Sequence, residues 1–330
     1  MEPIVRNQFT SRLMNEILAC FQLDSEFRNL GDFENYAFEV YQNGHPKILR
    51  ITHNSHRSFK ELESELDWIH YLQGCGIRIP AVFLSPNGNT VEAFEAENSF
   101  FYASLFEKAP GQHVKLDDNL FNEKLFRIWG KTVGKMHYFT KGYQPAATIL
   151  SRSQWNENDL VKLEYYYPKE EQSAIAQAYK VVEEVGELPK TKDSYGLIHT
   201  DIHHGNFFYN GDSIYIFDFD DACYHFFASD IAIPLYYAVN SKYFTGTREE
   251  RNEFARRFLH AFMEGYFEEN ELSQECLKTI PLFLKLRDVE LFSVFSKKIP
   301  VEERNERIQH WISEIKARII GDTPIIDLNL

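Results

Sequence analysis

YGLIHTDIHHGNFFYNGDSIYIFDFDDA, residues 195–222, is the stretch that decides the fold of this 330-residue sequence. An apolar pair ends a short strand just before a polar loop, residues 199–206. Two runs of aromatic and β-branched residues, 207–209 and 213–217, then flank an Asn-Gly-Asp turn. This pattern predicts a β-hairpin.

Three side chains with oxygen atoms are expected to converge at the open end of this hairpin. Asn206 enters the hairpin, Asp218 leaves it, and Asp201 lies in the loop just before. Two oxygen ligands with room for phosphate oxygens and water suit Mg²⁺. A third carboxylate nearby can accept a proton from an attacking hydroxyl. The clustered histidines of this loop lack the spacing of a zinc site within a regular element, so zinc is not expected.

The order of these residues matches the catalytic loop of kinases, His-x-Asp-x₄-Asn followed by Asp-Phe-x. Here it is written His199-Thr200-Asp201, then Asn206, then Asp218-Phe219-Asp220. The sequence is most similar to the aminoglycoside phosphotransferase family, whose relatives include choline and homoserine kinases. The resemblance implies an α+β, protein-kinase-like fold of two lobes, with a β-rich N-terminal lobe and a mainly helical C-terminal lobe.

The same resemblance implies a role for each polar residue of this segment. Asp201 would be the catalytic base, and Asn206 and Asp218 would hold Mg²⁺. His199 would brace the loop, and Asp230 would bond the loop backbone. The nucleotide would be ATP or GTP.

Hydrophobic periodicity outside this segment agrees with two lobes. Ser58 and Glu61 form a capping-box pattern that begins a helix. The segment 107–111, which ends in Pro-Gly, interrupts the strand pattern and separates the β-rich first third of the chain from the helical remainder. The predicted elements are a helix at 7–23, a hairpin within 33–52, a helix at 58–73 and strands within 81–106. We expect a nucleotide-binding lobe at 1–107 and a catalytic and substrate-binding lobe at 108–330.

A kinase needs a cation for the nucleotide phosphates and a carboxylate on a helix to hold that cation. Arg50 lies between Leu49 and Ile51, where the family places its cation, whereas Lys47 lies at the turn and on the opposite face. Glu65 projects from the apolar face of the helix at 58–73, so Arg50 is its expected partner. Gly31 and Asn35 belong to a short loop, 30–35, that is expected to cover the phosphates.

The features that serve activation-loop control in protein kinases are missing. Thr200 stands where protein kinases have Arg, and Asp220 stands where they have Gly. A small hydroxyl compound is therefore the expected acceptor: an amino alcohol, an aminoglycoside, homoserine or a sugar. Asp220 and Asp221 are candidates to bind an amine of that acceptor. The alternatives are a catalytically weak kinase-like binding protein, a bacterial-type Ser/Thr protein kinase, and a hydrolase with Asp201 as nucleophile.

Composition limits the partners and the compartment. The formal net charge is -14, which disfavours nucleic acid and anionic membranes because both require a basic surface. The 4 cysteines are scattered and fit no metal or redox motif. The N-terminus lacks the pattern of a signal peptide, and no apolar run is long enough to span a bilayer. We therefore expect a cytoplasmic protein; the sequence does not decide its oligomeric state.

Overall fold

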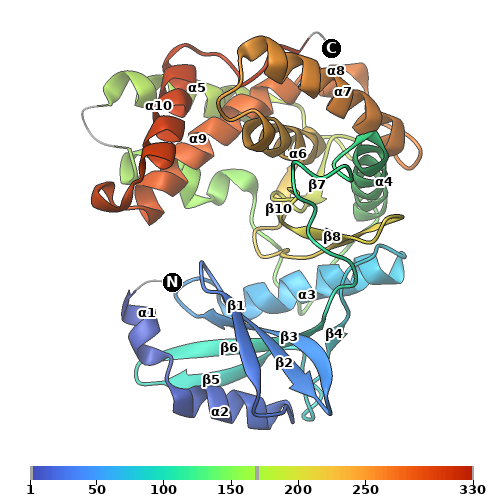
Figure 1. Ribbon diagram of the computed structural model, residues 1–330, viewed down its shortest axis with the longest axis vertical. Helices are drawn as coiled ribbons and strands as arrows, with labels where there is room; N and C mark the ends of the chain where they lie inside the picture. The colour runs from blue at the N-terminus through green and yellow to red at the C-terminus, as the bar shows by residue number, and fades with distance from the viewer. Residues whose placement is uncertain (1–2, 168–170, 329–330) are drawn as a thin grey trace. The chain divides into compact units, whose positions relative to one another are not determined.

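The computed structural model describes residues 3–167 and 171–328, and the chain divides into two compact units (Figure 1). The sheet unit contains the chain up to Gly111 together with Tyr143–Arg152 and Tyr215–Asp220. The helical unit contains Gln112–Gly142, Ser153–Ile214 and the chain from Asp221 onward. Two later segments thus fold with the first third of the chain. The division into functional lobes at 107/108 stays a prediction.

The sheet unit is an antiparallel sheet with helices on both faces. Its strands follow the order β1-β2-β3-β6-β4, and β5 also pairs with β6. Its elements are α1 (Pro3–Gln8), α2 (Ser11–Cys20), β1 (Phe27–Gly31), β2 (Tyr36–Gln42), β3 (His45–His53), α3 (Phe59–Gly74), β4 (Val82–Phe83), β5 (Glu92–Ala96) and β6 (Ser99–Glu107).

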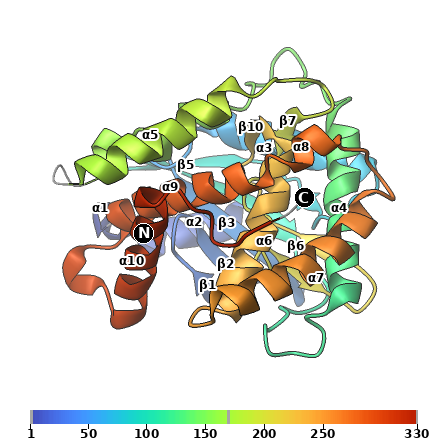
Figure 2. The same cartoon turned by 90° about the horizontal axis from the view of Figure 1, so that it is seen from above.

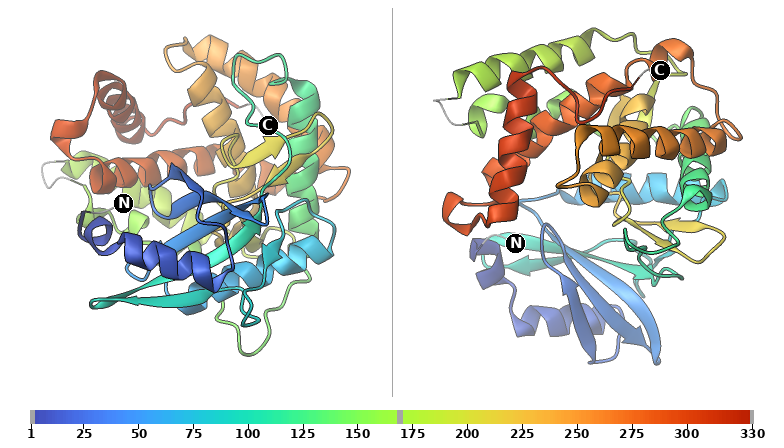
Figure 3. Two further views of the ribbon diagram at one scale, coloured as in Figure 1. Left: turned by 60° about the horizontal axis from the view of Figure 1, so that its bottom comes forward. Right: turned by 45° about the horizontal axis from the view of Figure 1, so that its top comes forward.

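Alternation along β3 explains how the two faces of this sheet are covered. Leu49 and Ile51 are fully buried in a cluster with apolar residues of α1 and α2, such as Val5 and Ile17. Arg50 lies between them and therefore points to the opposite face, where α3 packs. Figure 3, left, looks onto the face that α1 and α2 cover.

Two details of this unit differ from the sequence prediction. The helix predicted at 7–23 is two helices, because Thr10 adopts extended backbone and its hydroxyl caps α2 by accepting from the Leu13 amide at 3.2 Å. The strand β1 was not predicted, because all five of its residues are exposed and give no alternating pattern. Gly31 therefore ends a strand. The capping box of Ser58 and Glu61 is present as predicted.

The helical unit consists of helices and short strands. Figures 1 and 2 show α5, α9 and α10 grouped at one end of this unit and α4 and α7 at the other. Its helices are α4 (Glu123–Thr140), α5 (Gln172–Glu187), α6 (Phe227–Lys242), α7 (Arg248–Tyr266), α8 (Gln274–Leu277), α9 (Ile280–Lys298) and α10 (Glu306–Ile320), with 3₁₀ turns at Trp155–Glu157, Asp159–Val161, Leu163–Tyr165 and Val301–Glu303. No helix in the described ranges is both long and apolar enough to cross a bilayer.

Two short sheets frame the loop at 199–206. β7 (Tyr195–Ile198) ends where the loop begins and pairs antiparallel with β10 (Cys223–Phe226). β8 (Phe207–Tyr209) begins where the loop ends and pairs with β9 (Ile214–Ile216), which is the predicted hairpin. A sheet followed by helices confirms the predicted α+β class.

Helices α4 and α7 approach each other so closely that only glycine fits at their contact. A Cβ atom built on Gly265 would lie 1.9 Å from the carbonyl oxygen of Arg127, and one on Gly130 would lie 1.8 Å from that of Phe262. Both obstacles are backbone atoms of the facing helix, so a side chain cannot be accommodated by a rotamer change. The approach of these helices therefore depends on these two glycines.

We expect Gly265→Ala to lower the free energy of unfolding by about 3 kcal/mol, because the added methyl group separates α4 from α7. Urea unfolding measures this change. Gly186→Ala is the matched control: it lies in α5 with nothing within 4 Å of its added Cβ, and we expect it to raise stability by up to about 1 kcal/mol. Equal unfolding midpoints for the two variants would contradict the close-contact explanation.

Candidate active site

The loop that carries Asp201 is held in place by a buried carboxylate. Asp230, in the first turn of α6, accepts hydrogen bonds from the backbone amides of His199 (3.0 Å) and Thr200 (2.8 Å). Thr200 has a φ of 65°, a left-handed conformation that is costly for a β-branched residue. Its hydroxyl also donates to the carbonyl oxygen of Asp221 at 2.8 Å. The strained backbone is thus fixed by three hydrogen bonds just before Asp201.

Asp201 and Asn206 are brought together by this loop. The amide nitrogen Nδ2 of Asn206 donates to the carbonyl oxygen of Asp201 at 2.9 Å and to its Oδ2 at 3.0 Å. Both bonds use the nitrogen, so the side-chain oxygen of Asn206 is the atom that remains to ligate a cation. The donor set of an amide oxygen beside a carboxylate fits Mg²⁺.

The surroundings of Asp201 favour its ionised form. Burial alone would raise the pKa of this carboxyl group, but His203 and Arg287 together hold it below the ordinary value. The Nε2 atom of His203 lies 3.4 Å from Oδ2 of Asp201. Asp201 is therefore a carboxylate at neutral pH and can accept a hydrogen bond from a hydroxyl.

Sequence reasoning missed the cation beside Asp201. Arg287, in α9, donates from Nη2 to Oδ1 of Asp201 at 2.7 Å and to the hydroxyl of Tyr237 at 2.7 Å. Its Nη1 donates to Glu290 at 3.0 Å. The available signal was the charged pair Arg287-Asp288 between the apolar residues Leu286 and Val289 of this helix, since buried charges are rarely without partners.

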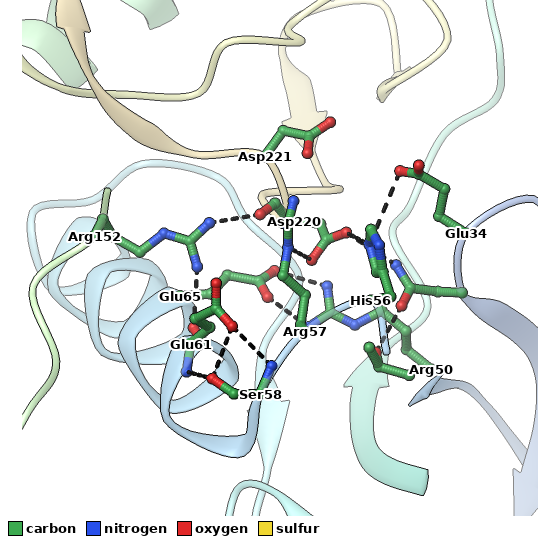
Figure 4. A network of polar contacts seen from close by, with 12 residues as sticks. Glu34, Arg50, His56, Arg57, Ser58, Glu61, Glu65, Arg152, Asp220 and Asp221 are labelled. Carbon is green, nitrogen blue, oxygen red and sulfur yellow. Dashed lines mark hydrogen bonds and ion pairs between the residues drawn. The ribbon is translucent and has the colours of Figure 1, made fainter. Parts of the chain in front are cut away.

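In the sheet unit, Arg50 and Glu65 form a bidentate ion pair (Figure 4). Nη1 and Nη2 of Arg50 each lie 2.7 Å from a different oxygen of Glu65. The side chain of Glu65 is 0% exposed and that of Arg50 is 11% exposed. Burial disfavours the charge of Arg50, but Glu65, Asp220 and Asp218 outweigh it and raise the pKa of the guanidinium. The contact expected from the sequence is formed, while its role in nucleotide binding stays a prediction.

Asp220 is the centre of a second polar cluster in the sheet unit (Figure 4). Its carboxylate accepts from Nε of Arg57 at 3.1 Å and from Nδ2 of Asn35 at 3.3 Å, and it lies 2.5 Å from Nε2 of His56. Burial would raise the pKa of Asp220, but Arg57 and His56 hold it well below the ordinary value. To bind an amine, as predicted, this carboxylate would have to exchange these partners.

Glu34, His56 and Asp220 each offer a ligand atom, and these atoms lie within 4.8 Å of one another. A metal site is disfavoured here, because Arg57 already places a positive charge beside Asp220. We interpret the cluster as an ion-pair network. Asn35 joins it through Asp220 and also accepts from the hydroxyl of Thr52 at 2.6 Å.

Asp218 follows β9 and has a left-handed backbone conformation. It has a φ of 67° and an exposed side chain. The next residue, Phe219, is buried and packs edge-on against Trp68 of α3, with ring centroids 5.5 Å apart. Asp218 belongs to the sheet unit, whereas Asp201 and Asn206 belong to the helical unit, so the convergence of the three stays a prediction.

The structure gives less support to the predicted roles of Gly31 and Asp221. A Cβ atom on Gly31 would meet nothing within 4 Å, so packing does not require glycine there. Asp221 is exposed, and its carbonyl oxygen accepts the hydrogen bond from Thr200. Their predicted roles, in nucleotide and amine binding respectively, stay predictions.

Comparisons with known proteins show the family and the fold to which this chain is similar. A model of the phosphotransferase enzyme family matches residues 26–272. The amicoumacin kinase of Bacillus subtilis is 36% identical over 301 residues, which cover 91% of this chain and 88% of the relative. An amicoumacin kinase solved in complex with AMP-PNP, Ca²⁺ and Ami has a TM-score of 0.93 at 32% identity, covering 100% of this chain and 98% of the other. A microcompartment-associated aminopropanol kinase has a TM-score of 0.76 at 19% identity, covering 95% and 98%, and supports the fold alone.

We expect Glu65→Gln to lower the free energy of unfolding by about 3 kcal/mol, because it leaves the buried Arg50 without its counter-charge. Glu63→Gln is the matched control on the same helix, since Glu63 is half-buried, and we expect a change within about 0.5 kcal/mol. Urea unfolding distinguishes the two. A Glu65 variant as stable as the Glu63 variant would mean that Arg50 finds another partner.

Proposed function

Because this chain belongs to the phosphotransferase enzyme family and is a small-molecule kinase, we propose that it transfers the γ-phosphoryl group of ATP to a hydroxyl of its acceptor. The observation that carries the proposal is the arrangement of Asp201 and Asn206 in a loop fixed by Asp230. The membership confirms the family resemblance of the sequence, and the family's structures confirm the protein-kinase-like fold.

Asp201 acts as the base in this proposal. Its ionised carboxylate accepts the proton of the acceptor hydroxyl and orients that oxygen for in-line attack on the phosphoryl group. Most of the rate enhancement in phosphoryl transfer comes from positioning and charge stabilisation. The fixed loop backbone serves the first of these requirements, because it leaves Asp201 little freedom to move.

We propose that Asn206 and Asp218 hold Mg²⁺, which would neutralise charge on the phosphates when bound. Arg50, oriented by Glu65, would contact the phosphates, and Gly31 and Asn35 would lie near them. The bidentate geometry of a guanidinium suits a phosphate as well as a carboxylate. In this assignment residues 1–107 bind the nucleotide and residues 108–330 bind the acceptor.

Amicoumacin is the acceptor that we propose first. The supporting observation is the 36% identity to an amicoumacin kinase across 91% of this chain. The absence of activation-loop features fits a small acceptor. A cytoplasmic location agrees with this proposal, because ATP is abundant there.

The first experiment is a thermal-shift titration with ATP and GTP, with and without Mg²⁺, followed by a turnover assay. A ligand that binds the folded state raises its stability by about 2.7 kcal/mol at 100 times its Kd. We expect a Mg²⁺-dependent shift with ATP and release of ADP when amicoumacin is added. A panel of an aminoglycoside, an amino alcohol and homoserine tests the other acceptors. No nucleotide-dependent shift would overturn the proposal.

We expect Asp201→Asn to lower kcat about 1,000-fold, because the neutral amide cannot accept the hydroxyl proton. The thermal shift with Mg²⁺ and ATP should remain close to that of the wild type. Asp212→Asn is the control, since Asp212 is an exposed turn carboxylate that forms an ion pair with Lys124 at the surface. Full turnover by the Asp201 variant would remove the base assignment.

We expect Asp218→Ala to abolish the Mg²⁺-dependent part of the ATP thermal shift, because one of the two proposed metal ligands is lost. Chelation of Mg²⁺ with EDTA should reduce the wild-type shift to the same value. If the variant kept a shift that EDTA removes, the metal would be held by other residues.

A further inference from the structure

We infer that Arg287 is a positioning residue for the transfer reaction: its guanidinium fixes the orientation of Asp201, and Glu290 and Tyr237 fix the guanidinium. The inference rests on the proposed role of Asp201 as base. It concerns residues of the helical unit alone, from the loop at 199–206 and from α6 and α9.

The guanidinium of Arg287 is held from three sides. Both hydrogens of Nη2 are used, one toward Oδ1 of Asp201 and one toward the hydroxyl of Tyr237, each at 2.7 Å. Nη1 donates to Glu290, one turn further along α9, at 3.0 Å. The carbon Cζ of Arg287 also lies 5.1 Å from the ring centroid of Tyr237, a cation–π contact. A long, flexible side chain is therefore restricted to one position.

This contact completes the anchoring of Asp201. Oδ1 accepts from Arg287, and Oδ2 accepts from Asn206 at 3.0 Å. Nε2 of His203 also lies 3.4 Å from Oδ2. The carboxylate cannot rotate without breaking its hydrogen bonds to Arg287 and Asn206. Oδ1 keeps a second lone pair, so the acceptor hydroxyl can still donate to the fixed group. Misplacement of a reacting group by about 1 Å can cost 100-fold in rate.

The neighbouring network shows what a purely structural ion pair looks like in this unit. Asp288 and Tyr236, each adjacent in sequence to a member of the Arg287 network, bind Arg318 of α10 instead. Arg318 donates from Nε and Nη2 to the two oxygens of Asp288, each at 2.7 Å. Arg318, Asp288 and Tyr236 are all buried and hydrogen-bonded to one another, as expected of an ion pair that contributes to the core.

The Arg287 network differs from this pair in one respect. The Nε atom of Arg287 is buried and has no hydrogen-bond partner among the described residues. An unsatisfied buried donor costs stability, and such groups often have a functional reason. In this arrangement Nε of Arg287 makes no hydrogen bond to a described residue, while Nη2 donates to Asp201. Arg287 does not transfer a proton itself: burial disfavours its charge, but Tyr237, Asp201 and Glu290 outweigh burial and raise the pKa of the guanidinium well above the ordinary value.

The experiment compares Arg287→Met, Arg287→Lys and the control Arg318→Lys in the ATP turnover assay, with amicoumacin or the first panel compound that the wild type phosphorylates. We expect Arg287→Met to lower kcat about 100-fold, with the KM for ATP within about twofold of the wild type. The kcat of Arg287→Lys should be about tenfold higher than that of Arg287→Met, because the lysine restores one cationic donor. Arg318→Lys should lower the melting temperature and leave kcat within about twofold.

A second measurement does not depend on turnover. Crystal structures of the wild type and of Arg287→Met are compared; Arg287→Lys replaces the Met variant if that variant does not fold. Relative to the wild type, the variant should show the Asp201 carboxylate rotated and its hydrogen bond to Asn206 lost. An unchanged carboxylate overturns the inference, and so does a loss of kcat no greater than that of Arg318→Lys. If Asp201→Asn is inactive while Arg287→Met is fully active, only this inference fails. If both variants are active, the assignment of Asp201 as base fails as well. A wild type that shows neither a nucleotide-dependent thermal shift nor ATP turnover would mean that the proposed function itself fails.

Discussion

The buried carboxylate of Asp230 is the interaction on which the catalytic loop depends. It is 0% exposed and accepts from the amides of His199 and Thr200 and from Nε2 of His137, the last at 3.3 Å. Burial lowers the pKa of His137, so the neutral ring donates from Nε2 and accepts at Nδ1 from the hydroxyl of Tyr266 at 2.9 Å. The loop is thereby connected through one hydrogen-bonded chain to the α4–α7 contact. A buried carboxylate is tolerated only with such a set of donors.

Arg50 of the sheet unit and Arg287 of the helical unit are both held by carboxylates, but in two different ways. Arg50 is bound by Glu65 through two parallel hydrogen bonds, a geometry that fixes the plane of the guanidinium. Arg287 is bound by two different carboxylates and a phenol, a geometry that fixes its position between them. The first arrangement suits a cation that must face a ligand, and the second suits a cation that holds another side chain.

The sequence predicted the parts of the site that depend on short spacing. The hairpin, the capping box of α3 and the pair of Arg50 and Glu65 follow from residue order, from alternation along a strand and from the periodicity of a helix. Arg287 could not be assigned in this way, because its partner Asp201 lies 86 positions away. The separation of α1 from α2 was missed because the cap at Thr10 interrupts an otherwise continuous apolar pattern. The partners of Asp220 were missed for the same reason as Arg287, since His56 lies 164 positions away.

The composition of the sheet unit has a consequence for synthesis of the chain. Phe219 fills the space beside Trp68, and Arg152 bonds the carbonyl oxygens of Glu61 (3.0 Å) and Asp220 (2.5 Å). On a ribosome that adds roughly 5–20 residues each second, the segment up to Gly111 emerges about 5–20 s before Asp220 does. During that interval the ring of Trp68 lacks its packing partner. The sheet unit therefore cannot complete its packing until a segment that is made much later has emerged.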